Sequence, residues 1–474
     1  MISKKIIINI IIGFINFLYI LKRKYGIKHN IIYSKYKSDK WIIFITGNPP
    51  NPIIDYLMNN TNNWKILVLG NKETIDSEWY KYKNSNILLY LSFKEQENLG
   101  FCSLRYISKN SFARKNIGYL FAIKYGAKEI YEIDDDIVVK NMNDIKIINY
   151  NNSQYSRISI GMNKDLKMIN PYSYFGINDI WPRGFFLKDI QFENNIFFNY
   201  ELKQIKIKPL IYQGLLNGEP DIDEIFYMTR KNKVDTLKIV FSENYPLLYT
   251  PGNFVPINSK NTKYLYDIFP SLPLFSSLNN RINDIYRGYI LQTYAWKYKG
   301  GIIFLHSNIY KYGNMNIDKN NFINEKKLYF EMDNFLKILK DIGKKESKPK
   351  EFLIKLIKSL VSKKILKKID LKIYFAFLKD LSKFNYIYSN DYNKRVIFDI
   401  NIKNYLNISC KFPYSYISKG QIFLMKNRNN KLIKHRDTNI YNNILLILIY
   451  NNSKLLSFNK YMIQLYNRYF QNKL

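Results

Sequence analysis

Short apolar runs alternate with helix-like patterns along the first third of the chain. Runs of strand character occupy residues 41–46, 65–70 and 86–91, and the first two end at turn-forming glycines. Between residues 111 and 127 the apolar positions recur every three or four residues, which predicts a helix. Residues 129–133 read as the next strand. Strands that alternate with helices predict an α/β fold with a mainly parallel sheet, in which ligands bind near the carboxyl ends of the strands.

The N-terminal apolar run fits two structures. Residues 6–21 are apolar except for Asn9 and Asn16. As a helix the run would span about 24 Å, which is short of a hydrocarbon core of roughly 30 Å. We favour an uncleaved signal-anchor, which predicts membrane association through the N-terminus and a single-pass protein of Golgi or ER type. The alternative is an amphipathic or buried helix packed on the folded part of a cytoplasmic protein.

The pattern changes again in the C-terminal part. Residues 344–350 form a charged linker candidate that contains proline, and residues 352–384 alternate apolar and Lys positions with helical spacing. This Lys-lined stretch fits either a helix on an anionic membrane or, as we favour, one face of a folded domain. Strand-like runs at residues 422–425 and 444–449 complete the prediction of a C-terminal α+β accessory region of unknown role.

The basic composition does not by itself indicate a particular binding partner. The formal net charge is +35, but the lysines are spread along the chain without an Arg-rich block. Lys, Asn and Ile share A/T-rich codons, so we favour genome base composition over a polyanion site and predict no specific nucleic-acid partner. Two cysteines and three scattered histidines give neither a disulfide framework nor a zinc site. Any chemistry therefore depends on carboxylates, Arg and Lys.

An acidic run follows the strand at residues 129–133. Asp134, Asp135 and Asp136 come directly after it, where a ligand of an α/β sheet binds. In extended chain, Asp134 and Asp136 point to the same side. Clustered carboxylates repel one another unless a cation compensates them, and oxygen ligands suit Mg²⁺ or Mn²⁺. We predict that these three residues bind such a metal, which also contacts a nucleotide diphosphate; the alternative is a solvated acidic turn.

Several separate blocks, in the same order, resemble the plant STELLO proteins, which are probable glycosyltransferases. A more distant likeness links them to the reversibly glycosylated polypeptide family. The likeness covers about residues 41–310. The blocks lie at residues 113–123, 126–136, 179–185, 213–223, 258–262, 284–289 and 296–301.

This resemblance implies a GT-A fold, that is, a Rossmann-like mixed sheet of nucleotide-diphospho-sugar transferases. It implies a metal-dependent glycosyltransferase that moves a sugar from a nucleotide-sugar donor to a glycan or protein hydroxyl. Phe186 stands where the family pattern leads us to expect Pro, and Asn217 and Glu219 replace two expected aspartates, which leaves room for a changed substrate pocket. The predicted domains are an N-terminal apolar segment and stem (1–40), a GT-A catalytic domain (41–310) and an accessory domain (311–474).

Within these blocks we predict donor-binding residues. Arg114 would contact the diphosphate from a helix start, and Asn116 a sugar hydroxyl. Trp181 would stack on a sugar ring, while Arg183 binds phosphate. The structural alternatives are a surface salt bridge at a helix start for Arg114, a helix cap or solvent exposure for Asn116, a core anchor for Trp181 and a brace of the loop for Arg183. The predicted donor site comprises Arg114, Asn116, Asp134, Trp181, Arg183 and Arg287.

Asp221 and Asp223 are the candidate catalytic bases. An inverting transfer needs a carboxylate to accept the proton of the attacking hydroxyl. Pro220 followed by acids is also a common way for a helix to begin, and a retaining mechanism needs no such base.

Other functions remain open. The main alternatives are a non-catalytic GT-A scaffold in a glycan-synthesis complex and a sugar-nucleotide mutase. A polyanion-binding module is the least favoured alternative.

Overall fold

The structure is a computed structural model. It describes residues 33–138, 158–160, 168–187, 200–202, 208–230, 239–311 and 319–389, except for residues 62, 110, 169, 178, 179, 244, 245 and 346. The N-terminal apolar run (6–21) and the C-terminal strand-like runs (422–425 and 444–449) lie outside the described residues. The predictions made for them therefore stay predictions.

The described strands form a single mixed sheet in the order β3-β2-β1-β4-β10-β8-β11-β9-β6-β7, with β5 paired to β11. From β3 to β4 the strands are parallel, and β10 is antiparallel to both β4 and β8. Two reversals make β8 parallel to β4, and β11 is parallel to β8. The strands are β1 (Lys40–Thr46), β2 (Lys65–Gly70), β3 (Leu88–Leu91), β4 (Glu129–Ile133), β5 (Ile137–Val138), β6 (Ile158–Ile160), β7 (Tyr200–Leu202), β8 (Pro209–Gly218), β9 (Leu247–Tyr249), β10 (Asn261–Leu265) and β11 (Gly301–Lys311).

The sequence predicted the parallel half of this sheet. The four expected strands correspond to β1, β2, β3 and β4 within two residues at each end. The α/β class with a Rossmann-like mixed sheet is confirmed. The antiparallel strand β10 was not recognised, because its residues Asn261, Thr262 and Lys263 are polar although all three are buried.

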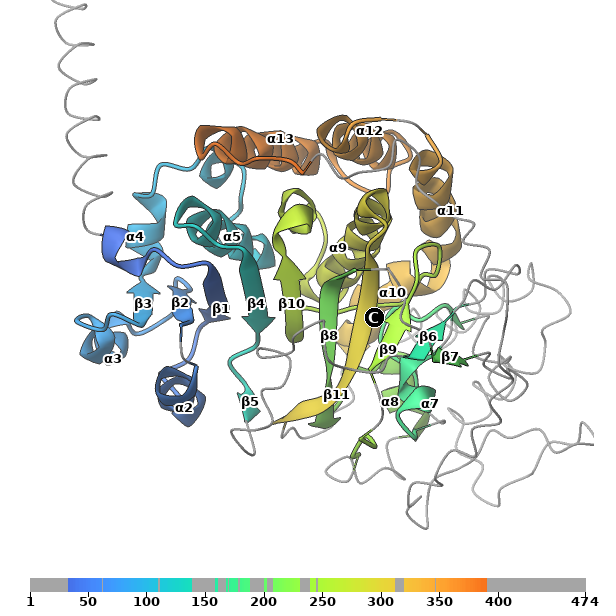
Figure 1. The fold of residues 1–474 in the computed structure, drawn as a ribbon, viewed down its shortest axis with the longest axis horizontal. Helices are drawn as coiled ribbons and strands as arrows, with labels where there is room; N and C mark the ends of the chain where they lie inside the picture. Colours follow the sequence, from blue (N-terminus) through green and yellow to red (C-terminus); the bar gives the residue numbers. More distant parts are fainter. Residues whose placement is uncertain are drawn as a thin grey trace, which may run out of the picture.

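Helices cover the two faces of the sheet unequally (Figure 1). On one face, α5, α9 and the later helices share a large apolar core with alternate residues of β1 and β2 such as Ile43 and Leu69. On the other face, α2 packs on Ile42 and Val68. The α-helices are α2 (Pro52–Asn60), α3 (Asp76–Trp79), α4 (Phe93–Glu97), α5 (Lys115–Lys124), α7 (Pro171–Tyr174), α8 (Glu224–Arg230), α9 (Asn280–Ala295), α10 (Lys319–Phe330), α11 (Met332–Gly343), α12 (Pro349–Ser362) and α13 (Lys368–Lys383), with 3₁₀ turns η1 (Ser34–Tyr36), η2 (Tyr80–Tyr82), η3 (Cys102–Arg105), η4 (Phe112–Arg114), η8 (Tyr266–Ser271) and η9 (Trp296–Tyr298).

The long helical pattern at residues 352–384 folds as two helices. Helix α12 ends at Ser362 and α13 begins at Lys368. In the turn, Lys364 has a left-handed φ of 60°, and Ile365 and Leu366 are buried in the core. The turn with this buried apolar pair separates the two helices, and α13 lies next to α12 along the top of the view in Figure 1.

Helices α10–α13 pack on the core that includes α9. Tyr286 of α9 stacks on Phe335 of α11 with 4.4 Å between ring centroids, and Tyr294 of α9 faces Phe352 of α12. The domain boundary at residue 310 remains a prediction, but the described helices beyond it cover apolar surface of α9. Within the described ranges, no helix combines the length and the hydropathy that crossing a membrane requires.

Candidate functional site

Several strands run in the same direction and end at one edge of the sheet, and four of them carry the residues of interest there. They are β1, β4, β8 and β11, and the residues at or just beyond their ends are Thr46, Asp134, Asp221 and Lys311. We call this the carboxyl edge. The carboxyl ends of parallel strands form the usual ligand site of such a sheet, so a ligand is expected to bind at this edge.

The acidic run Asp134–Asp136 lies at the carboxyl edge, where Asp135 and Asp136 form a turn between β4 and β5, and its three side chains have different partners. Asp135 accepts hydrogen bonds from the hydroxyl of Thr46 at 2.5 Å and the amide of Asn48 at 3.1 Å, beyond β1. Asp134 instead pairs with Lys115 at 3.3 Å and Asp136 with Lys311 at 2.6 Å. The side chains of Asp134 and Asp136 keep 25% and 47% of their surface exposed, so both can still meet a ligand.

A network of buried ion pairs lies in the interior next to the acidic run. Glu132 of β4 is fully buried between Lys115, at 3.0 Å, and Arg287, at 3.1 Å. Burial by itself raises the pKa of Glu132, but the two cations more than offset this and lower it. Burial likewise raises the pKa of Asp134, while Lys115 acts against that rise. Lys115 therefore forms ion pairs both with Glu132 inside β4 and with the partly exposed Asp134 just beyond the end of that strand.

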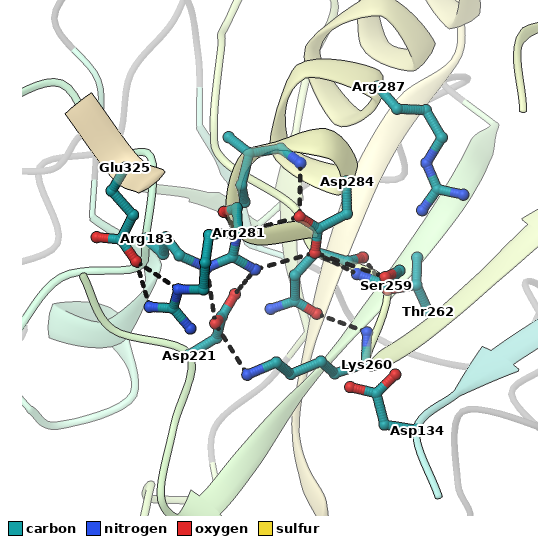
Figure 2. Close-up of polar contacts among 12 residues, drawn as sticks. Asp134, Arg183, Asp221, Ser259, Lys260, Thr262, Arg281, Asp284, Arg287 and Glu325 are labelled. Carbon is teal, nitrogen blue, oxygen red and sulfur yellow. Dashed lines mark hydrogen bonds and ion pairs between the residues drawn. The ribbon is translucent and has the colours of Figure 1, made fainter. Parts of the chain in front are cut away.

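A second network holds the predicted residues Arg183 and Asp221 (Figure 2). The guanidinium of Arg183 donates two hydrogen bonds of 3.0 Å to Asp221 and two of 3.0 Å to Asp284. Lys260 pairs with Asp221 at 3.0 Å and also acts against the raised pKa of Asp134. Lys260 thus connects the two predicted clusters at the carboxyl edge.

The two candidate bases have different electrostatics. Burial by itself would raise the pKa of Asp221, but Arg183 and Lys260 hold it well below its usual range. Burial and the nearby Glu325 raise the pKa of Asp223 to about 7. Asp223 accepts hydrogen bonds from the indole of Trp181 at 2.6 Å and the Phe226 N–H at 3.0 Å, directly before α8. The acids after Pro220 therefore begin a helix, and both carboxyl groups are almost fully buried, with 2% and 1% exposure.

The remaining predicted donor-binding residues lie in the interior. Arg114 is 2% exposed, donates to the side chain of Gln96 at 2.8 Å and lies over the ring of Phe93. Asn116 makes two hydrogen bonds with the backbone of Leu274, at 2.8 and 2.9 Å. These contacts differ from the alternatives that the sequence suggested, because Arg114 is buried and not in a surface salt bridge, and Asn116 is buried and binds the backbone of Leu274. The donor-binding roles of these residues, and of Trp181, Arg183 and Arg287, stay predictions.

Comparison with known proteins shows which proteins the chain is similar to. No family model matches the chain. Two proteins of Arabidopsis thaliana, named "Probable glycosyltransferase STELLO1" and "Probable glycosyltransferase STELLO2", are 30% and 28% identical to it over 361 residues, which are 75% of this chain and 46% of each relative. The chain therefore resembles the STELLO proteins over three quarters of its length. It spans about half the length of these curated relatives.

Sequence reasoning on this STELLO-like chain missed the lysines of the carboxyl edge. Lys115 and Lys260 belong to blocks that carry the resemblance, and Lys311 follows directly after the range of residues 41–310 that the likeness covers. Each of the three pairs with an acid that was predicted. A signal existed for Glu132, because a lone charge inside an apolar strand indicates a buried ion pair. For Lys260 and Lys311 no local pattern distinguishes them from the many surface lysines.

Proposed function

We propose that this STELLO-like chain is a glycosyltransferase that binds a nucleotide-sugar donor at the carboxyl edge of its sheet. The observation that carries the proposal is the pair of partly exposed carboxylates, Asp134 and Asp136, among three lysines at the end of a central strand. The names of the two relatives support the class of reaction. A donor supplies a negative diphosphate, which Lys115, Lys260 and Lys311 can attract.

The acidic run fits a divalent cation in one particular way. Among the described residues, no group of three or more His, Cys, Asp and Glu side chains is placed to hold a metal ion. Mg²⁺ in phosphate-transfer sites takes one or two carboxylates and completes its shell with substrate oxygens and water. Asp134 and Asp136 could hold a cation in that way, and the cation would neutralise the charge that develops on the departing nucleotide diphosphate. We therefore expect weak metal binding without a donor and strong binding with one.

The chain's own residues would position the donor. The ion pairs of Asp134 and Asp136 with lysines fix both acids before a ligand arrives, and Asp135 ties the run to the end of β1. Lys260 and Lys311, whose side chains are partly exposed, would then exchange a carboxylate partner for a phosphate oxygen. Asp221 is too strongly ion-paired to take a proton easily, so Asp223, with its pKa of about 7, is the better candidate base. Its burial requires a local opening before an acceptor hydroxyl could reach it.

The test is a thermal-shift panel of nucleotide-sugars, with and without Mn²⁺, followed by donor hydrolysis. A ligand at a hundred times its Kd stabilises the native state by about 2.7 kcal/mol, which raises Tm by a few degrees. We expect a shift that needs both donor and Mn²⁺ and that Asp134→Ala/Asp136→Ala abolishes. The control Asp341→Ala/Glu351→Ala removes two exposed acids elsewhere and should leave the shift unchanged.

The second candidate is a non-catalytic scaffold that keeps the fold to bind partners. The burial of both candidate bases favours it. A well-folded protein that shifts with no donor would support the scaffold and contradict the proposed enzyme. If the protein bound a donor but neither hydrolysed nor transferred it, the proposed binding site would be supported and the proposed catalysis would be wrong.

A further inference from the structure

The positive charge of the chain is unevenly distributed. Residues 349–383, which form α12, α13 and their connecting turn, contain ten Lys and three Asp or Glu. The first described range, residues 33–138, contains fourteen Lys or Arg and twelve Asp or Glu. A uniform codon bias would affect both regions alike. The excess on α12 and α13 therefore needs another explanation.

The lysines of these helices form stripes on their outer sides. On α13, Lys368, Lys372 and Lys379 are exposed at helical spacing, with the exposed Phe375 between them. On α12 the exposed lysines are Lys350, Lys355 and Lys358. The ammonium of Lys358 lies 5.9 Å from the ring centroid of Phe375, so the two stripes are neighbours. We call these six lysines and Phe375 the lysine face.

The acids of α13 are turned away from the lysine face. Asp370 and Asp380 are fully buried. Asp370 accepts the N–H of Ser277 at 3.0 Å, and Asp380 accepts the N–H groups of Cys102 and Ser103 at 2.8 and 3.0 Å. Glu351 is the exposed acid on these two helices. No described carboxylate forms an ion pair with any of the six lysines, so the face presents almost uncompensated positive charge to solvent.

The lysine face lies at the end of the sheet opposite the acidic run. Strand β10 is antiparallel to β4, and its last residue, Leu265, pairs with the first residue of β4. Turn η8 follows β10, and Tyr374 of α13 donates a hydrogen bond to Pro270 in that turn. Helix α13 therefore lies near the start of β4, while Asp134 lies beyond its other end (Figure 1).

The N-terminal part of the described chain enters at the same end. Tyr33 packs edge-on against Phe121 of α5, and the Ser38 N–H donates to the carbonyl of Tyr125 just after that helix. Helix α13 also packs on α5. The apolar run of residues 6–21 precedes this entry point by only about a dozen residues.

We propose that the lysine face docks on an anionic phospholipid bilayer. Phosphate and serine headgroups complement six unpaired ammonium groups, and Phe375 supplies an aromatic ring of the kind that inserts at the membrane interface. The apolar run of residues 6–21 adds a second membrane signal in the sequence, and one apolar signal plus a basic patch is the combination that gives stable attachment. Docking leaves the carboxyl edge pointing away from the bilayer. This inference does not depend on the proposed function.

The experiment measures lysine protection on the full chain. Vesicles of phosphatidylcholine and phosphatidylserine, in a ratio of about three to one, are compared with vesicles of phosphatidylcholine alone. Lysines are acetylated briefly and their modification is read by mass spectrometry. We expect Lys355, Lys372 and Lys379 to be modified several times more slowly with the anionic vesicles only. Lys72, Lys81 and Lys94, which are exposed in the nearly neutral region, should react equally in every sample.

Matched variants test whether charge on this face causes the binding. Each lysine near an anionic surface contributes about fivefold to binding, so Lys355→Gln/Lys372→Gln/Lys379→Gln should reduce binding to the anionic vesicles at least tenfold. The control Lys72→Gln/Lys81→Gln/Lys94→Gln makes the same change in net charge and should bind nearly as the wild type does. If both variants lose binding equally, only net charge acts, and the proposal is wrong.

If the N-terminal run inserts into both kinds of vesicle, the protein binds to both. The rate of lysine acetylation on the bound protein then still tests the proposal. Equal acetylation of the two lysine sets on bound protein would show that the face does not touch the bilayer. Protection of the lysine face by nucleic acid but not by anionic vesicles would assign it to a different partner. Either result would overturn the proposal.

Discussion

At the residue scale, Asp223 combines structural contacts with a titration near neutral pH. Burial and Glu325 raise its pKa to about 7, compared with about 3.9 in an unfolded chain. Between these values the folded state holds a proton that the unfolded state has released. The free energy of unfolding therefore falls as pH rises from about 4 to about 7, and it is constant with respect to this group above that range.

We predict that Asp223→Asn reduces this pH dependence, because an amide does not ionise. The difference in unfolding free energy between pH 5 and pH 7.5 should become smaller in the variant by about 2–3 kcal/mol, because the unfolded state has already released its proton at pH 5 and the folded state releases it near pH 7. Urea unfolding at the two pH values measures it. The exposed Asp341→Asn should leave the pH dependence unchanged. If Asp223→Asn keeps the full dependence of the wild type, the raised pKa is not present in the folded protein.

The sequence shows which residues are charged, but it does not show which charged residues form ion pairs with one another. The acidic run was recognisable because three acids follow an apolar strand. Arg183 and Asp221 were both chosen as site residues, yet their partnership was not predicted. Thirty-eight residues separate them in the chain, and only the tertiary fold brings the guanidinium within 3.0 Å of the carboxylate.

At the element scale, helix α5 determines where Lys115 meets the acidic run. Gly118 allows α5 to approach the sheet closely. A Cβ atom at this position would lie 2.9 Å from a methyl carbon of Ile43 on β1 and 2.9 Å from one of Leu69 on β2. The helix could accept a side chain there only by moving away from both strands, which would also move Lys115 at its start.

We predict that Gly118→Ala destabilises the protein by about 1–3 kcal/mol, the usual cost of overpacking a core. Chemical denaturation measures the change. Gly47→Ala is the matched control, because its Cβ would meet Asn71 at an ordinary 3.6 Å and should cost much less. Equal effects of the two substitutions would contradict the close packing of α5 on β1 and β2.

Element prediction succeeded where the pattern was local. The expected strands and the helix before the acidic run correspond to β1–β4 and α5. It failed for β10, a buried strand of polar residues, and for the break between α12 and α13. In both cases contacts with distant parts of the chain outweigh local preference: the sheet buries Thr262, and the core buries Ile365 and Leu366.

At the scale of the whole molecule, helices α10–α13 complete the core around α9. Phe335 and Phe352 pack against tyrosines of α9, and Leu353, Leu356 and Phe377 are fully buried in the same cluster. Without these helices, a large apolar surface of α9 would meet water.

We therefore predict that a chain ending at Lys311 loses its cooperative unfolding transition, while a chain ending at Ser389, which keeps α10–α13, retains it. Circular dichroism during heating measures both. A shorter chain with an unchanged Tm would instead establish residues 41–310 as an independent domain, as the sequence predicted.

The sequence alone determined the α/β class, the position of the acidic run after a central strand, and the resemblance to the STELLO proteins, because these depend on local periodicity and on residue order. Only the tertiary structure decided which charges meet. The positions of Lys260 and Lys311 beside predicted acids, the burial of Asp221 and Asp223, and the grouping of unpaired lysines on α12 and α13 all follow from the packing of segments far apart in the chain. Electrostatic energy depends on distance and burial in space, and periodicity along the chain contains neither.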